Sequence, residues 1–171
     1  PRRFGKSMAA NMLTAYYSRG CDSREMFQGL KIAKHTDFEK HLNQYNVIHL
    51  NMRDYLTESE NMKQLIQFVE EDLLDELQQE FADLRMPRRR TLVKVLEQAF
   101  AQYKIPFVFI IDEWDCIFRV HKSDAASQKT YLDFLRNLLK DKSYIALAYM
   151  TGILPIKKYG EHSAINAFYE Y

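Results

Sequence analysis

The sequence has little of what several classes of protein require. Only two of its 171 residues are cysteines, Cys21 and Cys116, which is too few for a disulfide scaffold or a four-thiolate zinc site. We therefore expect reduced thiols in an intracellular protein. The longest strong apolar run covers only 105–111, far short of the roughly 18 residues of a membrane-spanning helix. The five histidines lack the spacing of a metal-binding helix, so we predict no histidine metal site.

Excess charge of one sign and chain-breaking residues are also scarce. Lys and Arg together number 24 and Asp and Glu 23, for a formal net charge of +1. Bulk charge therefore gives no argument for a nucleic-acid or membrane partner. Glycine occurs five times and proline four times, so breaks between elements are few. With 47% hydrophobic and 27% charged residues, the composition is typical of a folded domain, or part of one.

Apolar periodicity predicts strands that alternate with helices. Helices are predicted over 7–18, 58–84, 88–103 and 125–140, and strands over 30–33, 46–52, 107–111 and 144–150. The runs at 107–111 and 144–150 are apolar without alternation, which is typical of strands buried on both faces of a parallel sheet. The pattern therefore predicts an α/β domain with a mostly parallel sheet.

The first predicted helix follows Gly5, Lys6 and Ser7, as in the second half of a phosphate-binding loop. Gly5 would let the backbone approach a phosphate, and N–H groups at the helix start, including that of Met8, would face the anion. Lys6 would contact the β- and γ-phosphates, and the Ser7 hydroxyl is a suitable ligand for Mg²⁺. The alternative is an ordinary helix start with Lys6 in solvent.

Acidic residues follow the apolar run at 107–111. Asp112 and Glu113 would lie at the carboxyl end of this strand, where open α/β sheets bind ligands. We predict that Asp112 binds Mg²⁺ and that Glu113 points to the other face and polarises the attacking water as a general base. The alternative is that Asp112 caps a turn and Glu113 is solvated.

Thr151 follows the predicted strand at 144–150. A polar residue at this strand end would sense the γ-phosphate and orient water, so Thr151 is a third catalytic candidate with Lys6 and Glu113. The alternative is a simple turn formed by Thr151 and Gly152. Asp115 is expected to have a supporting or structural role.

Three segments, in this order and spacing, resemble the AAA-ATPase-like family of predicted bacterial ATPases. They read PRRFGKS at 1–7, IIDEWD at 110–115 and YMTGILPIKKYG at 149–160, and the likeness covers essentially the whole chain. It implies a P-loop NTPase core of the ASCE/AAA-like type, a three-layer sandwich, with ATP as its nucleotide. By position, the phosphate loop corresponds to Arg3, Phe4, Gly5, Lys6 and Ser7, and the metal and catalytic acids to Asp112 and Glu113.

The resemblance also implies a domain organisation. The strand that leads into the phosphate loop would precede Pro1 and the last strand would follow Tyr171, so residues 1–171 are predicted to be a partial domain. Family members often carry a restriction-endonuclease-like nuclease domain. The predicted function is therefore Mg²⁺-dependent ATP hydrolysis that powers or regulates an attached effector such as a nuclease.

Other functional interpretations stay open. One is a nucleotide-dependent switch or scaffold with negligible turnover. The partners considered are ATP, further copies of the chain and DNA reached through the effector, with no membrane and a cytoplasmic location. Arg85 and the run 88–90 form the strongest basic cluster, which is either a DNA-phosphate contact or, as we favour, a solvated corner between helices. Arg119 and Arg136 are arginine-finger candidates by residue type alone.

Overall fold

The computed structural model describes residues 5–154. Its helical elements are α1 (Lys6–Tyr17), α2 (Arg24–Phe27), the 3-10 helix η1 (Lys31–Lys34), α3 (Phe38–His41), α4 (Met52–Glu58), α5 (Met62–Glu80), α6 (Leu92–Tyr103), α7 (Cys116–Val120) and α8 (Ala125–Leu139). Its strands are β1 (Asn46–Asn51), β2 (Phe107–Asp112) and β3 (Ile145–Met150). The order of elements confirms the predicted α/β class.

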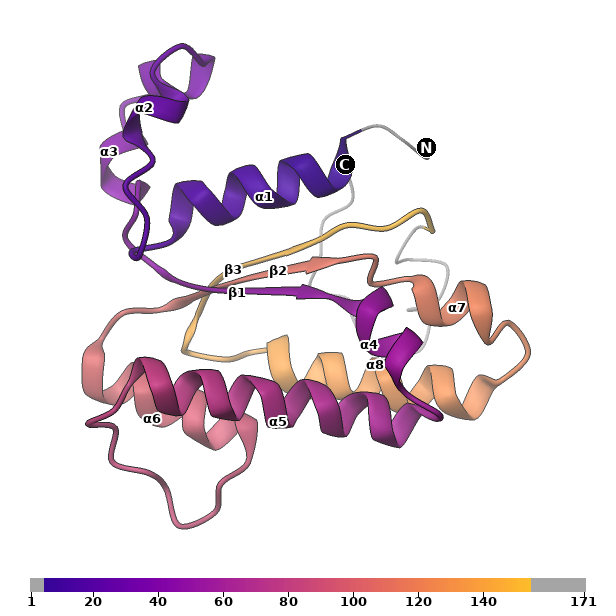
Figure 1. The fold of residues 1–171 in the computed structure, drawn as a ribbon. Helices are drawn as coiled ribbons and strands as arrows, with labels where there is room; N and C mark the ends of the chain where they lie inside the picture. The colour runs from indigo at the N-terminus through magenta and orange to yellow at the C-terminus, as the bar shows by residue number, and fades with distance from the viewer. Residues whose placement is uncertain (1–4, 155–171) are drawn as a thin grey trace.

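The three strands form one parallel sheet in the order β1-β2-β3. Helix α1 covers one face of this sheet, while α5, α6 and α8 lie against the other (Figure 1). The register pairs Asn51 with Asp112 and Met150 with Ile111. The carboxyl ends of all three strands therefore meet at one edge of the sheet, which is the edge that carries the predicted acids.

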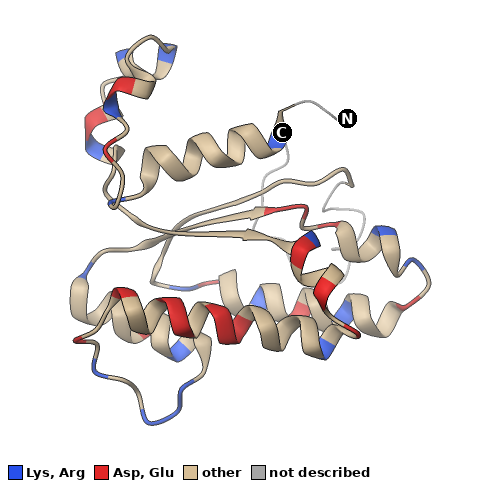
Figure 2. Ribbon diagram, viewed as in Figure 1, with Lys and Arg blue, Asp and Glu red and all other residues tan. Residues whose placement is uncertain are grey.

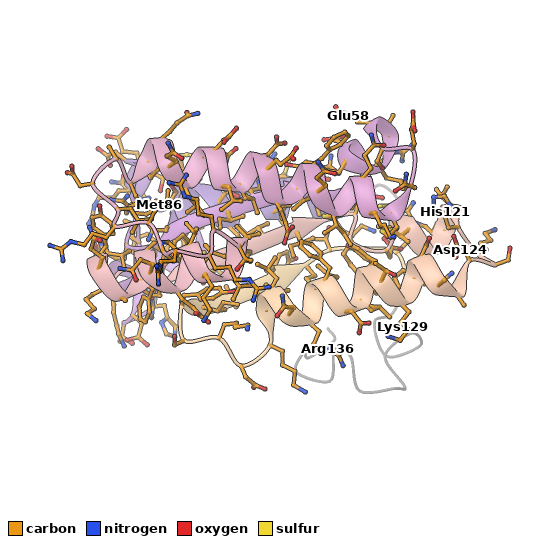
Figure 3. The ribbon with its side chains drawn as sticks, turned by 90° about the horizontal axis from the view of Figure 1, so that it is seen from below. Glu58, Met86, His121, Asp124, Lys129 and Arg136 are labelled. Atoms are coloured by element: carbon orange, nitrogen blue, oxygen red, sulfur yellow. The ribbon has the colours of Figure 1, made fainter. Side chains whose placement is uncertain are left out.

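The core lies between the sheet and the layer of α5, α6 and α8. Every residue of β2 is buried, as its unbroken apolar run predicts, and α5 buries one stripe at helical spacing (Leu65, Val69, Leu73 and Leu77). Each such side chain contributes about 1.5–3 kcal/mol through burial. Figure 3 views this helical layer from below, with its side chains drawn as sticks.

Several predicted boundaries are wrong. The helix expected over 58–84 is shorter than predicted, since α5 begins at Met62 and ends at Glu80. The side chain of Asn61, just before it, accepts a hydrogen bond from the Gln64 amide at 3.0 Å. The helix expected from 88 begins at Leu92. Asn61 satisfies a free N–H at the start of α5, and this cap marks the true boundary.

The strand expected at 30–33 is also wrong. Residues Lys31–Lys34 form a 3-10 helix, and the Ala33 amide bonds locally to the Leu30 carbonyl at 3.2 Å. Leu30 and Ile32 are 39% and 45% exposed. Because neither side chain reaches the core, no sheet contact stabilises an extended backbone here.

Strand β3 corrects a further expectation. The apolar run at 144–150 predicts a strand buried on both faces. In the structure, Leu147 is 37% exposed and the other residues of β3 are at most half-buried. Within the described residues, β3 pairs with β2 alone and forms one edge of the sheet.

No helix in the described part of the chain is long and apolar enough to span a membrane.

Candidate functional site

The start of α1 is an open cluster of backbone donors. Gly5 has φ 73°, and its carbonyl accepts the Ala9 amide at 2.8 Å, the first bond of the helix. Helix geometry leaves the N–H groups of Lys6, Ser7 and Met8 without intrahelical acceptors. A Cβ placed on Gly5 would meet nothing within 4 Å, so glycine is needed here for its backbone conformation and the space beside it is open to a ligand.

The carboxyl end of β2 lies against this helix start. The Ser7 Oγ donates to Asp112 Oδ2 at 2.6 Å, and the Thr151 hydroxyl donates to the other oxygen of the same carboxylate. The Glu113 amide also donates to Asp112 Oδ1, at 2.9 Å. The structure therefore brings together residues from three distant segments that the sequence assigns to one site.

Asp112 is charged at neutral pH. Burial by itself raises its pKa, but hydrogen bonds from Ser7, Thr151 and the Glu113 amide, together with nearby His49, outweigh burial and lower the pKa below its ordinary value. A charged carboxylate beside a hydroxyl supplies the hard oxygen ligands that Mg²⁺ prefers. The donor set at Asp112 therefore fits this metal.

Few protein groups would complete such a metal site. Among residues 5–154, no group of three or more His, Cys, Asp or Glu side chains is placed to hold a metal ion. Mg²⁺ typically binds through one or two protein oxygens and completes its shell with water and substrate phosphates. The pair Ser7 and Asp112 is consistent with that mode of binding and not with a closed, all-protein metal cage.

Lys6 does not extend into solvent. Its Nζ donates to the Gly152 carbonyl at 2.9 Å, across 146 residues of sequence. Gly152 belongs to the loop that follows β3, where the Thr151 amide donates to the Ile111 carbonyl at 2.9 Å. The ammonium therefore lies at the same sheet edge as Asp112, and the phosphate-binding role of Lys6 stays a prediction.

The two adjacent acids diverge. Asp112 contacts Ser7 of α1, whereas the Glu113 carboxylate forms an ion pair with Arg119 of α7. Glu113 has φ 54°, in the left-handed region that non-glycine residues rarely adopt. Asp115 is fully buried, and its Oδ2 accepts backbone amides of the loop after β3. Arg119, one of the two arginine-finger candidates, thus contacts acids of its own chain.

The β1 side of this sheet edge was not predicted from the sequence. A cavity of about 410 Å³ is lined by His49, Asn51, Asp54, Tyr55, Glu58 and Asp72. Asn51 is the sheet neighbour of Asp112. A polar residue at the end of the predicted strand at 46–52 could have indicated that this strand also contributes to the site. The carboxylates of this cavity repel phosphate, so the triphosphate is better placed at the start of α1.

Some predicted residues lie elsewhere. Arg3 and Phe4 are outside the described residues. Arg85 and the run 88–90 are exposed in the loop between α5 and α6, which Figure 2 shows as a basic segment. Figures 1 and 3 place this loop, with Met86, at the far end of the molecule from α7 and His121. Arg136 pairs with Asp133 one turn earlier on α8.

Fold and site together define an α/β protein whose parallel sheet gathers polar side chains against the start of one helix. Residues 1–160 match the AAA-ATPase-like family, described as "Predicted AAA-ATPase". The chain belongs to this family, which confirms the resemblance carried by its three motifs. No curated protein and no solved structure matches the chain.

Proposed function

We propose that this chain is a P-loop NTPase core of the ASCE/AAA-like type that binds ATP with Mg²⁺ and hydrolyses it. The observation that carries the proposal is the 2.6 Å hydrogen bond from Ser7 Oγ to Asp112 Oδ2. It joins the start of α1 to the end of β2, which are the two places where a phosphate loop and a metal-binding acid would have to meet. Membership of a family of predicted ATPases supports the same function.

The phosphate-binding roles fall to α1. The free N–H groups of Lys6, Ser7 and Met8 face an incoming anion with the positive end of the helix dipole. Lys6 exchanges its bond to the Gly152 carbonyl for the β- and γ-phosphates, which is a favourable exchange because a phosphate carries full negative charge. Arg3 and Phe4 complete the loop by their position in the family motif.

The metal and catalytic roles fall to the strand ends. Ser7 and Asp112 would hold Mg²⁺, which neutralises charge on the phosphate oxygens when bound. Glu113 orients and polarises the attacking water, and Thr151, bonded to Asp112, senses the γ-phosphate. Stabilisation of the transition state then comes mainly from positioned charges and dipoles.

The hydrolysis powers or regulates an attached effector, and DNA would be reached through that effector. A nucleotide-dependent switch with negligible turnover is the second candidate. In such a switch the ion pair between Glu113 and Arg119 would hold the carboxylate away from water, whereas in an ATPase the paired carboxylate faces the attacking water. Single-turnover hydrolysis of radiolabelled ATP distinguishes a working ATPase from such a switch.

The decisive variant is Glu113→Gln in the full-length protein. It removes the carboxylate charge and keeps the side-chain shape, so ATP binding should persist while Mg²⁺-dependent hydrolysis falls by about 100-fold or more. Glu25→Gln is the matched control, because Glu25 lies in α2, away from the sheet edge. Hydrolysis that is equal in Glu113→Gln and wild type would remove Glu113 from its role.

A further inference from the structure

One guanidinium links the two acids that follow Asp112. Arg119 forms an ion pair with Glu113, and its Nε lies 3.3 Å from Asp115 Oδ2. The side chains of Arg119 and Glu113 are only 20% and 23% exposed, and that of Asp115 is fully buried. Burial by itself lowers the pKa of Arg119, but the Glu113 and Asp115 carboxylates raise it, so the guanidinium remains charged.

Asp115 connects this pair to the loop after β3. Its Oδ2 accepts the backbone amides of Ile153 and Leu154, each at 2.9 Å. These amides directly follow Thr151 and the Gly152 carbonyl that holds Lys6. A chain of contacts therefore runs from the Thr151 loop through Asp115 and Arg119 to the carboxylate of Glu113.

Burying the Asp115 carboxylate costs more free energy than a purely structural contact with the loop requires. A neutral oxygen would be enough to accept two amides, whereas a fully buried carboxylate pays a desolvation penalty. Within the described part of the chain, Asp115 Oδ1 and Arg119 Nε are also buried without hydrogen-bond partners, so the 3.3 Å contact between Arg119 Nε and Asp115 Oδ2 is a charge attraction and not a hydrogen bond. The negative charge of Asp115 also attracts the Arg119 guanidinium, which in turn pairs with Glu113.

We propose that Asp115 and Arg119 are positioning residues for ATP hydrolysis: Asp115 fixes Arg119, and Arg119 fixes one oxygen of Glu113 so that the other is directed at the attacking water. The inference rests on the proposed function, in which Glu113 activates water. A free glutamate samples many side-chain rotamers, whereas Glu113 contacts Arg119 of α7 from a backbone with φ 54°. The ion pair selects one of those conformations, and correct placement of a catalytic group within about 1 Å is worth up to about 100-fold in rate.

The test compares Arg119→Gln, Arg119→Lys and wild type in the full-length protein. ATP affinity and the single-turnover rate constant for hydrolysis are measured with Mg²⁺ present. Arg119→Gln should lower the rate constant about 10- to 100-fold and leave the ATP dissociation constant within about twofold, because no described contact joins Arg119 to α1. Arg119→Lys keeps the charge and should restore part of the rate. Arg24→Gln is the control: it breaks an exposed ion pair with Glu39, and the variant should match wild type.

A double variant separates positioning from a general structural role. If Arg119 acts only through Glu113, Glu113→Gln with Arg119→Gln should hydrolyse ATP no more slowly than Glu113→Gln alone. An additive further loss, a parallel loss of ATP affinity, or a rate for Arg119→Gln equal to or above wild type would overturn the inference. Asp115 retains its two amide donors in Arg119→Gln, so circular dichroism should report a folded protein. If Arg119→Gln does not fold, the comparison of Arg119→Lys with wild type tests the inference.

The outcomes also separate this inference from the proposed function. Wild type that hydrolyses ATP in a Glu113-dependent way, with Arg119→Gln unaffected, would reject the positioning role and leave the ATPase standing. Wild type that neither binds nor hydrolyses ATP would reject both.

Discussion

The Ser7 hydroxyl and the Asp112 carboxylate lie 2.6 Å apart although 105 residues separate them in the sequence. Ser7 is fixed by the first turn of α1 and Asp112 by the last residue of β2, so the contact reports how the helix sits on the sheet. Ser7 and Asp112 both present hard oxygen atoms. A divalent cation that replaced the hydrogen bond between them would find two ligands in place.

The first prediction concerns the hydroxyl of Ser7. Ser7→Ala removes a proposed Mg²⁺ ligand and should raise the Mg²⁺ concentration needed for half-maximal hydrolysis by about 10-fold or more, since loss of even outer-shell partners costs about 10- to 100-fold in metal affinity. Ser7→Thr keeps the hydroxyl and is the matched control. The measurement is a Mg²⁺ titration of ATP hydrolysis at saturating ATP. An identical Mg²⁺ dependence for all three proteins would rule out Ser7 as a ligand.

The second prediction concerns pH and Asp112. Burial raises the pKa of this carboxyl, but the Ser7, Thr151 and backbone hydrogen bonds outweigh burial and lower it overall. The charged form is therefore favoured by folding, and its stabilisation is present above the ordinary Asp pKa of about 3.9 and lost as the pH falls below that value. The free energy of unfolding lost in Asp112→Asn should be largest near neutral pH and shrink in acid.

Urea unfolding of wild type and Asp112→Asn between about pH 7 and pH 3 measures that difference directly. The midpoint of its pH dependence should lie below the ordinary Asp pKa. A difference that grows on acidification would mean that folding raises the pKa of Asp112, contrary to the hydrogen bonds that the carboxylate accepts.

Long apolar patterns predicted the fold well. The run at 107–111 identifies β2 because only a strand covered on both faces tolerates five consecutive buried residues, and the spacing on α5 identifies its buried stripe. Helices such as α4 and α7 were missed because seven and five residues contain too few turns for a periodicity to emerge. Their positions depend on tertiary packing more than on local preference.

The site was predicted only in part. Lys6, Ser7 and Asp112 belong to motifs with a chemical meaning, so their convergence could be expected from the sequence. The contact from Arg119 to Glu113 could not, because it depends on a left-handed backbone at a glutamate, which no residue type marks. The β3 edge was misjudged for a similar reason, since burial depends on neighbouring strands and not on hydrophobicity alone.

The third prediction concerns the close packing of the loop after β3. A Cβ on Gly152 would lie 2.6 Å from Trp114 Nε1 and 2.8 Å from Asp115 Oδ1, and both side chains are buried. Gly152→Ala should therefore destabilise the fold by about 1–3 kcal/mol and move the carbonyl that holds Lys6. Thermal or urea unfolding gives the stability, and the fluorescence of Trp114, the sole tryptophan, reports the displaced loop.

Gly29→Ala is the matched control for that substitution. A Cβ on Gly29 would meet nothing within 4 Å, and replacement of an unstrained glycine stabilises proteins by about 0.4–1 kcal/mol because the unfolded chain loses freedom. The two alanine variants should thus change stability in opposite directions. If Gly152→Ala matched Gly29→Ala in both stability and Trp114 emission, the loop after β3 would not be packed against Trp114 and Asp115, and the link from this loop through Asp115 to Arg119 would lose its physical basis.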